Sequence, residues 1–156
     1  MAKPAAQARQ YLIFTLGATR FGLPIETVAE VVVPRELTVL PRAPQFLKGL
    51  MRLREQVVPV IDLRERFGLD ASRGGRLLVV KSPALIAYHV DSVDEVVECG
   101  ETELQAAPAA VAAFIPEAFM SGVFGRAGGF IIALKPEMLL TREESGALAA
   151  TAGASV

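Results

Sequence analysis

Histidine and cysteine are the side chains that could bind a metal or act as a nucleophile, and each occurs once. His89 lies in a strand-like stretch and Cys99 precedes a glycine, with no second histidine or CxxC partner near either. A zinc site needs several such ligands, and a nucleophilic triad needs a base beside the nucleophile. We therefore interpret His89 as a residue that satisfies a local hydrogen bond and Cys99 as a packed thiol.

Two carboxylate pairs have the residue types for general acid and base catalysis. They are Glu26 with Glu30, and Asp91 with Glu95. The pairs occupy matching positions of a sequence repeat, which favours a repeated structural or interface role over catalysis. The glycine-rich stretch GRAGG at 125–129 lacks the Lys and Ser/Thr of a phosphate loop and precedes a strand-like segment, so it predicts a turn. The sequence therefore predicts neither an enzyme nor a bound metal or cofactor.

A group of cationic side chains is the remaining candidate for function. Lys48, Arg52 and Arg54 stand beside an apolar, β-branched run, VVPVI at 57–61. Exposed charge often marks only a solvated face, and that interpretation stays open. Arginine beside an exposed apolar strand edge is, however, typical of a protein interface. We expect residues 46–69 to contain a hairpin that presents these cations.

The elements that must position this hairpin are other short strands. Segments 11–16, 21–25 and 28–33 are expected strands, and the three prolines of 34–44 predict an extended connection. Pro59 has no N–H for a ladder, so its strand is expected at a sheet edge or a bulge. Short strands without alternating long helices predict an all-β barrel or sandwich.

An internal repeat refines this prediction. Two pairs of segments can be laid on one another: 25–32 on 90–97, and FLKGL at 46–50 on FMSGV at 119–123. Gly49 then falls on Gly122, and Ile25 falls on Val90 at an expected equivalent buried position. A duplication of this kind predicts two similar small β units packed face to face and related by an approximate two-fold axis.

Composition limits the cellular context. The 156 residues suit one domain or two small lobes with a shared core, and 13 Gly and 10 Pro interrupt the apolar runs before membrane length. The N-terminal residues have no apolar core of a signal peptide, so we expect a cytoplasmic protein without membrane insertion. A net charge of −1 and the lack of a basic tail argue against nucleic acid as a partner.

The stretch KGLMRLREQVVPVIDLRERFGL at 48–69 resembles the signature of the CheW-like domain, the coupling module of bacterial chemosensory arrays. The family usually reads KG, two or three residues, LRG and a VVPVIDL-type strand, and the resemblance extends over 11–140. Glu55 departs from it, because the family usually has glycine there. A positive φ at this position would strain a glutamate. We expect the Glu55 side chain to point to solvent at the hairpin tip.

The resemblance implies two small five-stranded barrel lobes related by the duplication, with short helical segments. The expected organisation is a disordered tail over 1–10, one CheW-like domain over 11–140, and a C-terminal helix or tail over 141–156. The lobes are expected at roughly 11–70 and 76–140.

The resemblance also implies a non-enzymatic scaffold that couples chemoreceptors to a chemotaxis-type histidine kinase. The first lobe would bind the CheW-like regulatory domain of the kinase, and the groove between the lobes would bind the chemoreceptor's cytoplasmic tip. Arg54 and Glu30 would be polar anchors of a contact surface with apolar filling from valines. The expected contact residues are Val28, Glu30, Val31, Lys48, Gly49, Arg52 and Arg54.

Two other functions stay open. Glu55 at the usual glycine position allows a divergent CheW-like protein that binds receptors and competes with kinase coupling. A cleft between the lobes would allow a sensor of small ligands.

Overall fold

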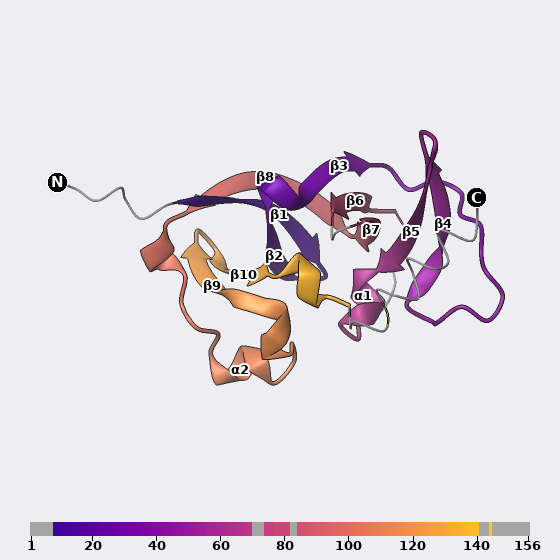
Figure 1. Cartoon of the computed structure of the whole chain (residues 1–156). Coiled ribbons are helices and arrows are strands. Elements are labelled where there is room, and N and C mark those ends of the chain that lie inside the picture. Colours follow the sequence, from indigo (N-terminus) through magenta and orange to yellow (C-terminus); the bar gives the residue numbers. More distant parts are fainter. Residues whose placement is uncertain (1–7, 70–73, 82–83, 141–143, 145–156) are drawn as a thin grey trace.

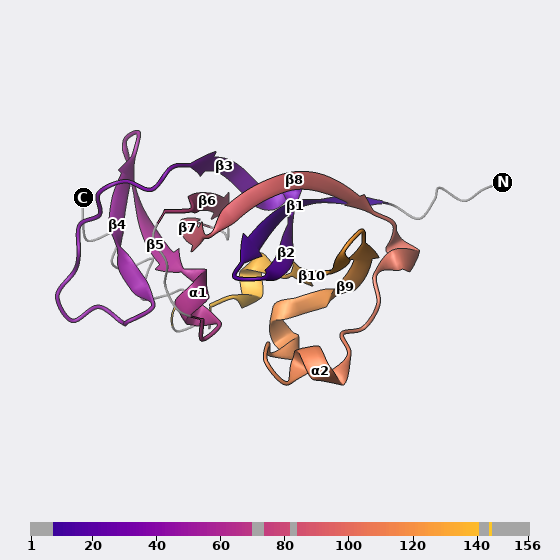
Figure 2. The same ribbon diagram turned by 180° about the vertical axis from the view of Figure 1, so that it is seen from behind.

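The computed structural model describes residues 8–69, 74–81, 84–140 and 144, which form two five-stranded sheets (Figures 1 and 2). The expected all-β class with short helical segments is confirmed. Most of the expected terminal segments, 1–10 and 141–156, lies outside the described residues. Strand β1 already begins at Arg9, so the expected N-terminal tail extends too far.

The strands divide between the two sheets in an order that does not follow the chain. The first sheet contains, in spatial order, β8 (Ser92–Cys99), β1 (Arg9–Leu16), β2 (Thr19–Pro24), β10 (Gly129–Leu134) and β9 (Met120–Arg126). The second contains β3 (Val28–Val32), β6 (Arg76–Lys81), β7 (Leu85–Val90), β5 (Gln56–Asp62) and β4 (Leu47–Leu53). Short helical segments connect them: η1 (Ile25–Thr27), α1 (Leu63–Arg66), η2 (Glu101–Glu103), α2 (Ala109–Ala112), η3 (Glu117–Phe119) and η4 (Pro136–Met138).

Both sheets have the same pairing pattern. In each, an outer strand pairs antiparallel with a hairpin, and the second strand of that hairpin pairs parallel with a second hairpin. Hairpin β1–β2 thus meets β9–β10, and β6–β7 meets β4–β5. This pattern supports the predicted duplication and corrects the expected lobes at 11–70 and 76–140. The second sheet is built from the continuous run of strands β3 to β7, and the first from β1 and β2 together with β8 to β10, so each sheet takes strands from both halves of the chain.

The sheets are open, which corrects the expected barrels. Among the described residues, no ladder joins the outer strands β8 and β9, or β3 and β4. The connections that precede β4 and β9 instead lie against those strands through single bridges, Thr38 to Leu50 and Gln105 to Val123.

The core follows the two-residue alternation of the strands. In β1, Leu12 and Phe14 belong to the large central cluster, which contains residues of both sheets. Tyr11 and Ile13 point to the other face of the strand and pack in a separate cluster with Phe124 of the same sheet. A third cluster, around Met51 and Val58, consists of buried residues from strands of the second sheet alone. Val90 is fully buried in the central cluster while Ile25 is only partly buried against it, so the expected equivalence of these two positions holds in part.

The two glycines at matching positions of the repeat, Gly49 and Gly122, allow a close approach of the backbone. Gly49 and Gly122 have φ of 155° and 151°, and both are buried. A Cβ at Gly49 would lie 2.7 Å from the carbonyl oxygen of Thr38, and one at Gly122 would lie 2.5 Å from that of Gln105. Each glycine therefore lets the preceding connection bridge to its hairpin.

Pro59 does not lie in an edge strand. Strand β5 has β4 on one side and β7 on the other. Its parallel ladder with β7 begins only at Val60, so the missing N–H of Pro59 removes no bond on that side. The expected bulge in the strand of Pro59 is also wrong, because the ladder bulges on the partner strand β4, where Lys48 is the extra residue between Leu47 and Gly49.

Candidate protein interface

An exposed ion pair joins β3 to the tip of the β4–β5 hairpin. Arg54, in the turn between these two strands, donates from Nη1 to Glu30 Oε2 at 2.6 Å and from Nη2 to Glu30 Oε1 at 3.4 Å. Arg35 Nη1 also donates to the Arg52 carbonyl at 3.3 Å. Because β3 and β4 are the two outer strands of their sheet, these contacts link its opposite edges at one end (Figure 1). We call the residues Glu30, Val31, Arg52 and Arg54 the tip surface.

The turn that carries Arg54 has unusual backbone geometry. Arg54 has a φ of 57°, in the left-handed region that favours glycine. Glu55 does not have a positive φ, and its side chain is exposed as expected. The glutamate at the usual glycine position therefore fits this turn, and the strained residue is its neighbour Arg54.

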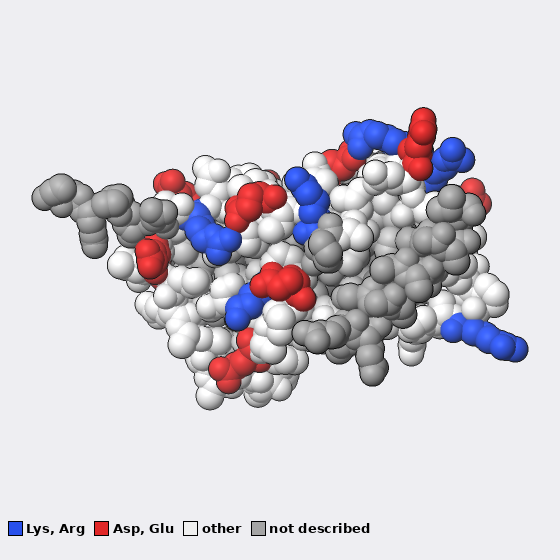
Figure 3. All heavy atoms as spheres, in the orientation of Figure 1, with Lys and Arg blue, Asp and Glu red and all other residues white. Residues whose placement is uncertain are grey.

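Exposed valines lie beside this ion pair. Val31 is 40% exposed on the outer strand β3, and Val33, which the sequence analysis did not select, is 58% exposed. Val28 instead packs partly against the central cluster. Figure 3 shows basic and acidic side chains gathered over the tip of the β4–β5 hairpin. The tip surface thus combines charged groups with an apolar strand edge.

Besides Val28, two more of the predicted contact residues lie outside the tip surface. Lys48, at the bulge of β4, forms an ion pair with Glu65 of α1. Gly49 is buried under the Thr38 backbone and the Leu37 side chain, so its role is in the fold. Sequence spacing alone does not show to which side the Lys48 side chain points, because the bulge takes Lys48 out of the regular alternation of the strand.

A buried arginine forms a polar cluster that the sequence analysis missed. Arg64 of α1 is 1% exposed and donates to both carboxylate oxygens of Asp62, at 3.1 and 3.2 Å, and to Asp91 Oδ1 at 2.7 Å. Asp91 Oδ2 also accepts from the Gly17 backbone N–H at 2.6 Å. Asp62 caps α1 through the Arg64 backbone N–H. This cluster connects both halves of the chain, and Asp91 therefore has a structural role.

His89 and Cys99 lie in the environments expected for them. His89 Nε2 is 2.5 Å from the Gly74 carbonyl and Nδ1 is 3.4 Å from Arg64 Nη2. A carbonyl only accepts, so Nε2 carries the proton and Nδ1 accepts from the guanidinium. Cys99 is a buried free thiol, and burial raises its pKa above the usual range.

The described residues offer little support for metal or ligand chemistry. No group of three or more His, Cys, Asp and Glu side chains in this part of the chain could hold a metal ion. The space between the sheets contains the central hydrophobic cluster. A cavity of about 640 Å³ lies elsewhere, lined by Arg9, Tyr11, Cys99, Gly100, Glu101 and Leu104. None of the described helices is long and apolar enough to span a membrane.

Comparison with known proteins shows to which family the chain belongs. The sequence model of the CheW-like domain matches residues 10–144. The chain belongs to the CheW-like family. It is 29% identical to the chemotaxis protein CheW of Klebsiella aerogenes over 140 residues, 87% of this chain and 84% of that protein. It is 25% identical to the Treponema pallidum chemotaxis protein CheW over 148 residues, 90% of this chain and 86% of that protein.

A solved CheW structure supports the same conclusion. The crystal structure of the scaffolding protein TtCheW from Thermoanaerobacter tengcongensis matches with a TM-score of 0.75 and 31% identity. The match covers 85% of this chain and 92% of that one. The expected CheW-like family and the expected role as a chemotaxis scaffold are therefore confirmed.

Proposed function

We propose that this CheW-like protein couples a chemoreceptor's cytoplasmic tip to a chemotaxis-type histidine kinase in the cytoplasm, by binding and without catalysing a reaction. Within this proposal, the tip surface binds the CheW-like regulatory domain of the kinase. The receptor tip binds at the groove between the two lobes. Nucleic acid and membrane insertion have no part in it.

The geometry of Arg54 carries the proposal. A left-handed φ costs a residue with a Cβ about 1 kcal/mol or more, which glycine would avoid. The Arg54 side chain is 76% exposed, and an ion pair so exposed contributes only about 0 to 1 kcal/mol. The fold alone therefore gains little from arginine at this position, and binding to a partner would explain it.

The composition around Arg54 fits a protein partner. Val31 and Val33 are exposed on and beside the outer strand β3. Arginine is enriched at protein interfaces, and exposed apolar side chains beside it would be covered on binding. The Glu30 carboxylate orients the guanidinium before a partner arrives, which reduces the entropy lost on binding.

Arg54→Ala tests this role. Alanine keeps the Cβ and the strained φ, so the variant should melt within a few degrees of wild type. It should lose at least about tenfold in affinity, which is roughly 1.4 kcal/mol, for the kinase regulatory domain or the receptor tip. Calorimetric titration of both partners against folded protein measures this change.

Arg9→Ala is the matched control. Arg9 also forms an exposed pair, with Glu26, but on the other sheet. Its removal should leave both affinities unchanged. Unchanged affinities in a folded Arg54→Ala variant would remove Arg54 from the interface.

The other expected functions gain no support from the described residues. Glu55 is exposed and its backbone is unstrained, so it gives no structural reason to separate receptor binding from kinase coupling. A sensor that enclosed a small ligand between the two sheets would have to displace the central hydrophobic cluster, whereas a groove on the surface does not require this.

A further inference from the structure

Arg66 forms a carboxylate-binding arrangement at the end of α1, away from the tip surface. Its Nη1 and Nη2 donate to Glu144 Oε2 and Oε1 at 2.9 and 2.8 Å, so both terminal nitrogens bind one carboxylate. Its Nε donates to the Leu139 carbonyl at 3.1 Å. Paired bonds of this kind select a planar carboxylate and fix its orientation.

Two aromatic rings hold the Arg66 guanidinium in place. Its central carbon lies 5.6 Å from the centre of the Phe46 ring and 5.8 Å from that of the Phe119 ring. These phenylalanines begin the repeated segments FLKGL and FMSGV, so each half of the duplication supplies one ring. Contact with aromatic rings favours a cation and limits the rotamers of its side chain. The site is thus built at the seam of the two repeats and is preorganised.

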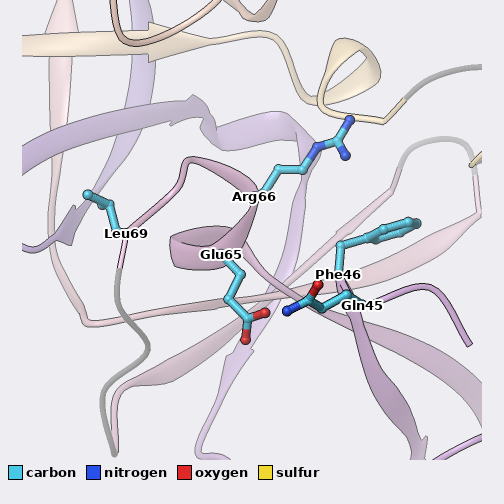
Figure 4. Close-up of a pocket in the computed structure, with 5 residues that line it drawn as sticks. All are labelled: Gln45, Phe46, Glu65, Arg66 and Leu69. Atoms are coloured by element: carbon cyan, nitrogen blue, oxygen red, sulfur yellow. The ribbon is translucent and has the colours of Figure 1, made fainter.

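A pocket of about 390 Å³ lies beside Arg66. It is lined by Gln45, Phe46, Glu65, Arg66 and Leu69. Figure 4 shows that Arg66 extends to the opposite side of α1 from Glu65. The Glu65 carboxylate is paired with Lys48, so its charge is offset. The pocket therefore offers room for a larger segment whose acidic side chain reaches the guanidinium.

We propose that Arg66 is a docking site for an acidic side chain of the chemoreceptor tip and that Glu144 of the chain's own C-terminal segment occupies it in the unbound protein. The Glu144 carboxylate shows which chemistry the site accepts. Glu144 lies outside the ten described strands, so none of their ladders includes it. The inference rests on the proposed function, because it places receptor binding at the seam between the lobes.

The energetics allow exchange. The Arg66 and Glu144 side chains are 17% and 22% exposed, so solvent screens the pair only weakly, and an incoming carboxylate has to replace both of its paired hydrogen bonds. Release of Glu144 leaves the aromatic contacts and the Leu139 hydrogen bond of Arg66 intact. The bound Glu144 thus competes with an incoming carboxylate and lowers the apparent affinity of the receptor tip.

Glu144→Gln tests the competition, because glutamine keeps the side-chain size and removes the charge. We expect affinity for a soluble fragment of the receptor tip to rise about two- to fivefold. Arg66→Gln should lower that affinity, and adding Glu144→Gln to it should then give no further gain. Melting curves identify which variants are folded.

Glu103→Gln is the matched control, since Glu103 binds Arg126 through both oxygens, at 2.9 and 3.3 Å, on the other sheet. Its affinity for the receptor fragment should equal that of wild type. Unchanged or lower affinity in Glu144→Gln, with wild type binding normally, would overturn this inference and leave the proposed function standing. If the receptor fragment bound neither wild type nor any variant, both this inference and the proposed function would be overturned.

Discussion

Replacing Arg64 with methionine should lower the free energy of unfolding by about 3 to 5 kcal/mol. Methionine fills much of the volume but leaves the carboxylate of Asp62, which is 3% exposed, without its guanidinium partner. A buried charge without compensation is expensive because the interior solvates it poorly. Urea denaturation followed by circular dichroism measures the change.

Two further variants separate the buried charge from general damage. Arg9→Met breaks a pair whose side chains are 55% and 58% exposed, and it should cost about 1 kcal/mol or less. Asp62→Asn added to Arg64→Met should recover part of the loss, because it removes the uncompensated charge. Equal losses for Arg64→Met and Arg9→Met would contradict the buried cluster.

Gly49→Ala should cost about 2 kcal/mol or more, and Gly122→Ala a similar amount. The new Cβ at position 49 would lie 2.7 Å from the Thr38 carbonyl oxygen and 3.0 Å from Leu37 Cβ. The bridge between Thr38 and Leu50 would have to open or shift. Thermal melting of the variants gives the comparison.

Gly17→Ala supplies the control for Gly49→Ala. Gly17 also has a positive φ, 61°, but apart from its chain neighbours no heavy atom of the described residues lies within 4 Å of the Cβ position. Alanine there should cost only the backbone strain, about 1 kcal/mol. If Gly17→Ala and Gly49→Ala lost the same stability, the close approach at Gly49 would not matter to the fold.

Much of the fold could be predicted because its signals are local. Alternating apolar residues and glycine-containing turns indicate short strands, and the repeat of FLKGL in FMSGV indicates the duplication. The division of the strands between the sheets, with β3 to β7 in one sheet and the remaining strands in the other, could not be predicted in this way. A repeat shows which segments are alike, whereas pairing of β3 with β6 depends on contacts between distant parts of the chain.

The candidate interface was predictable to a similar degree. Glu30 and Arg54 were selected from the family resemblance, and the structure joins them at the hairpin tip. The directions of Lys48 and Gly49 depend on a bulge and a close backbone approach, which composition does not reveal. Arg64 and Arg66 were missed because the local sequence DLRER does not distinguish a buried arginine from an exposed one. The one available signal was Asp62 as a helix cap.

Co-sedimentation tests the coupling function most directly. Vesicles or assemblies that carry the receptor's cytoplasmic region are mixed with the kinase, with and without this protein, and pelleted. We expect the kinase to pellet with the receptor, and its phosphorylation to respond to the receptor, only when this protein is present. Arg54→Ala should reduce both effects. Equal amounts of pelleted kinase and equal phosphorylation with and without the protein would contradict its role as a coupling scaffold.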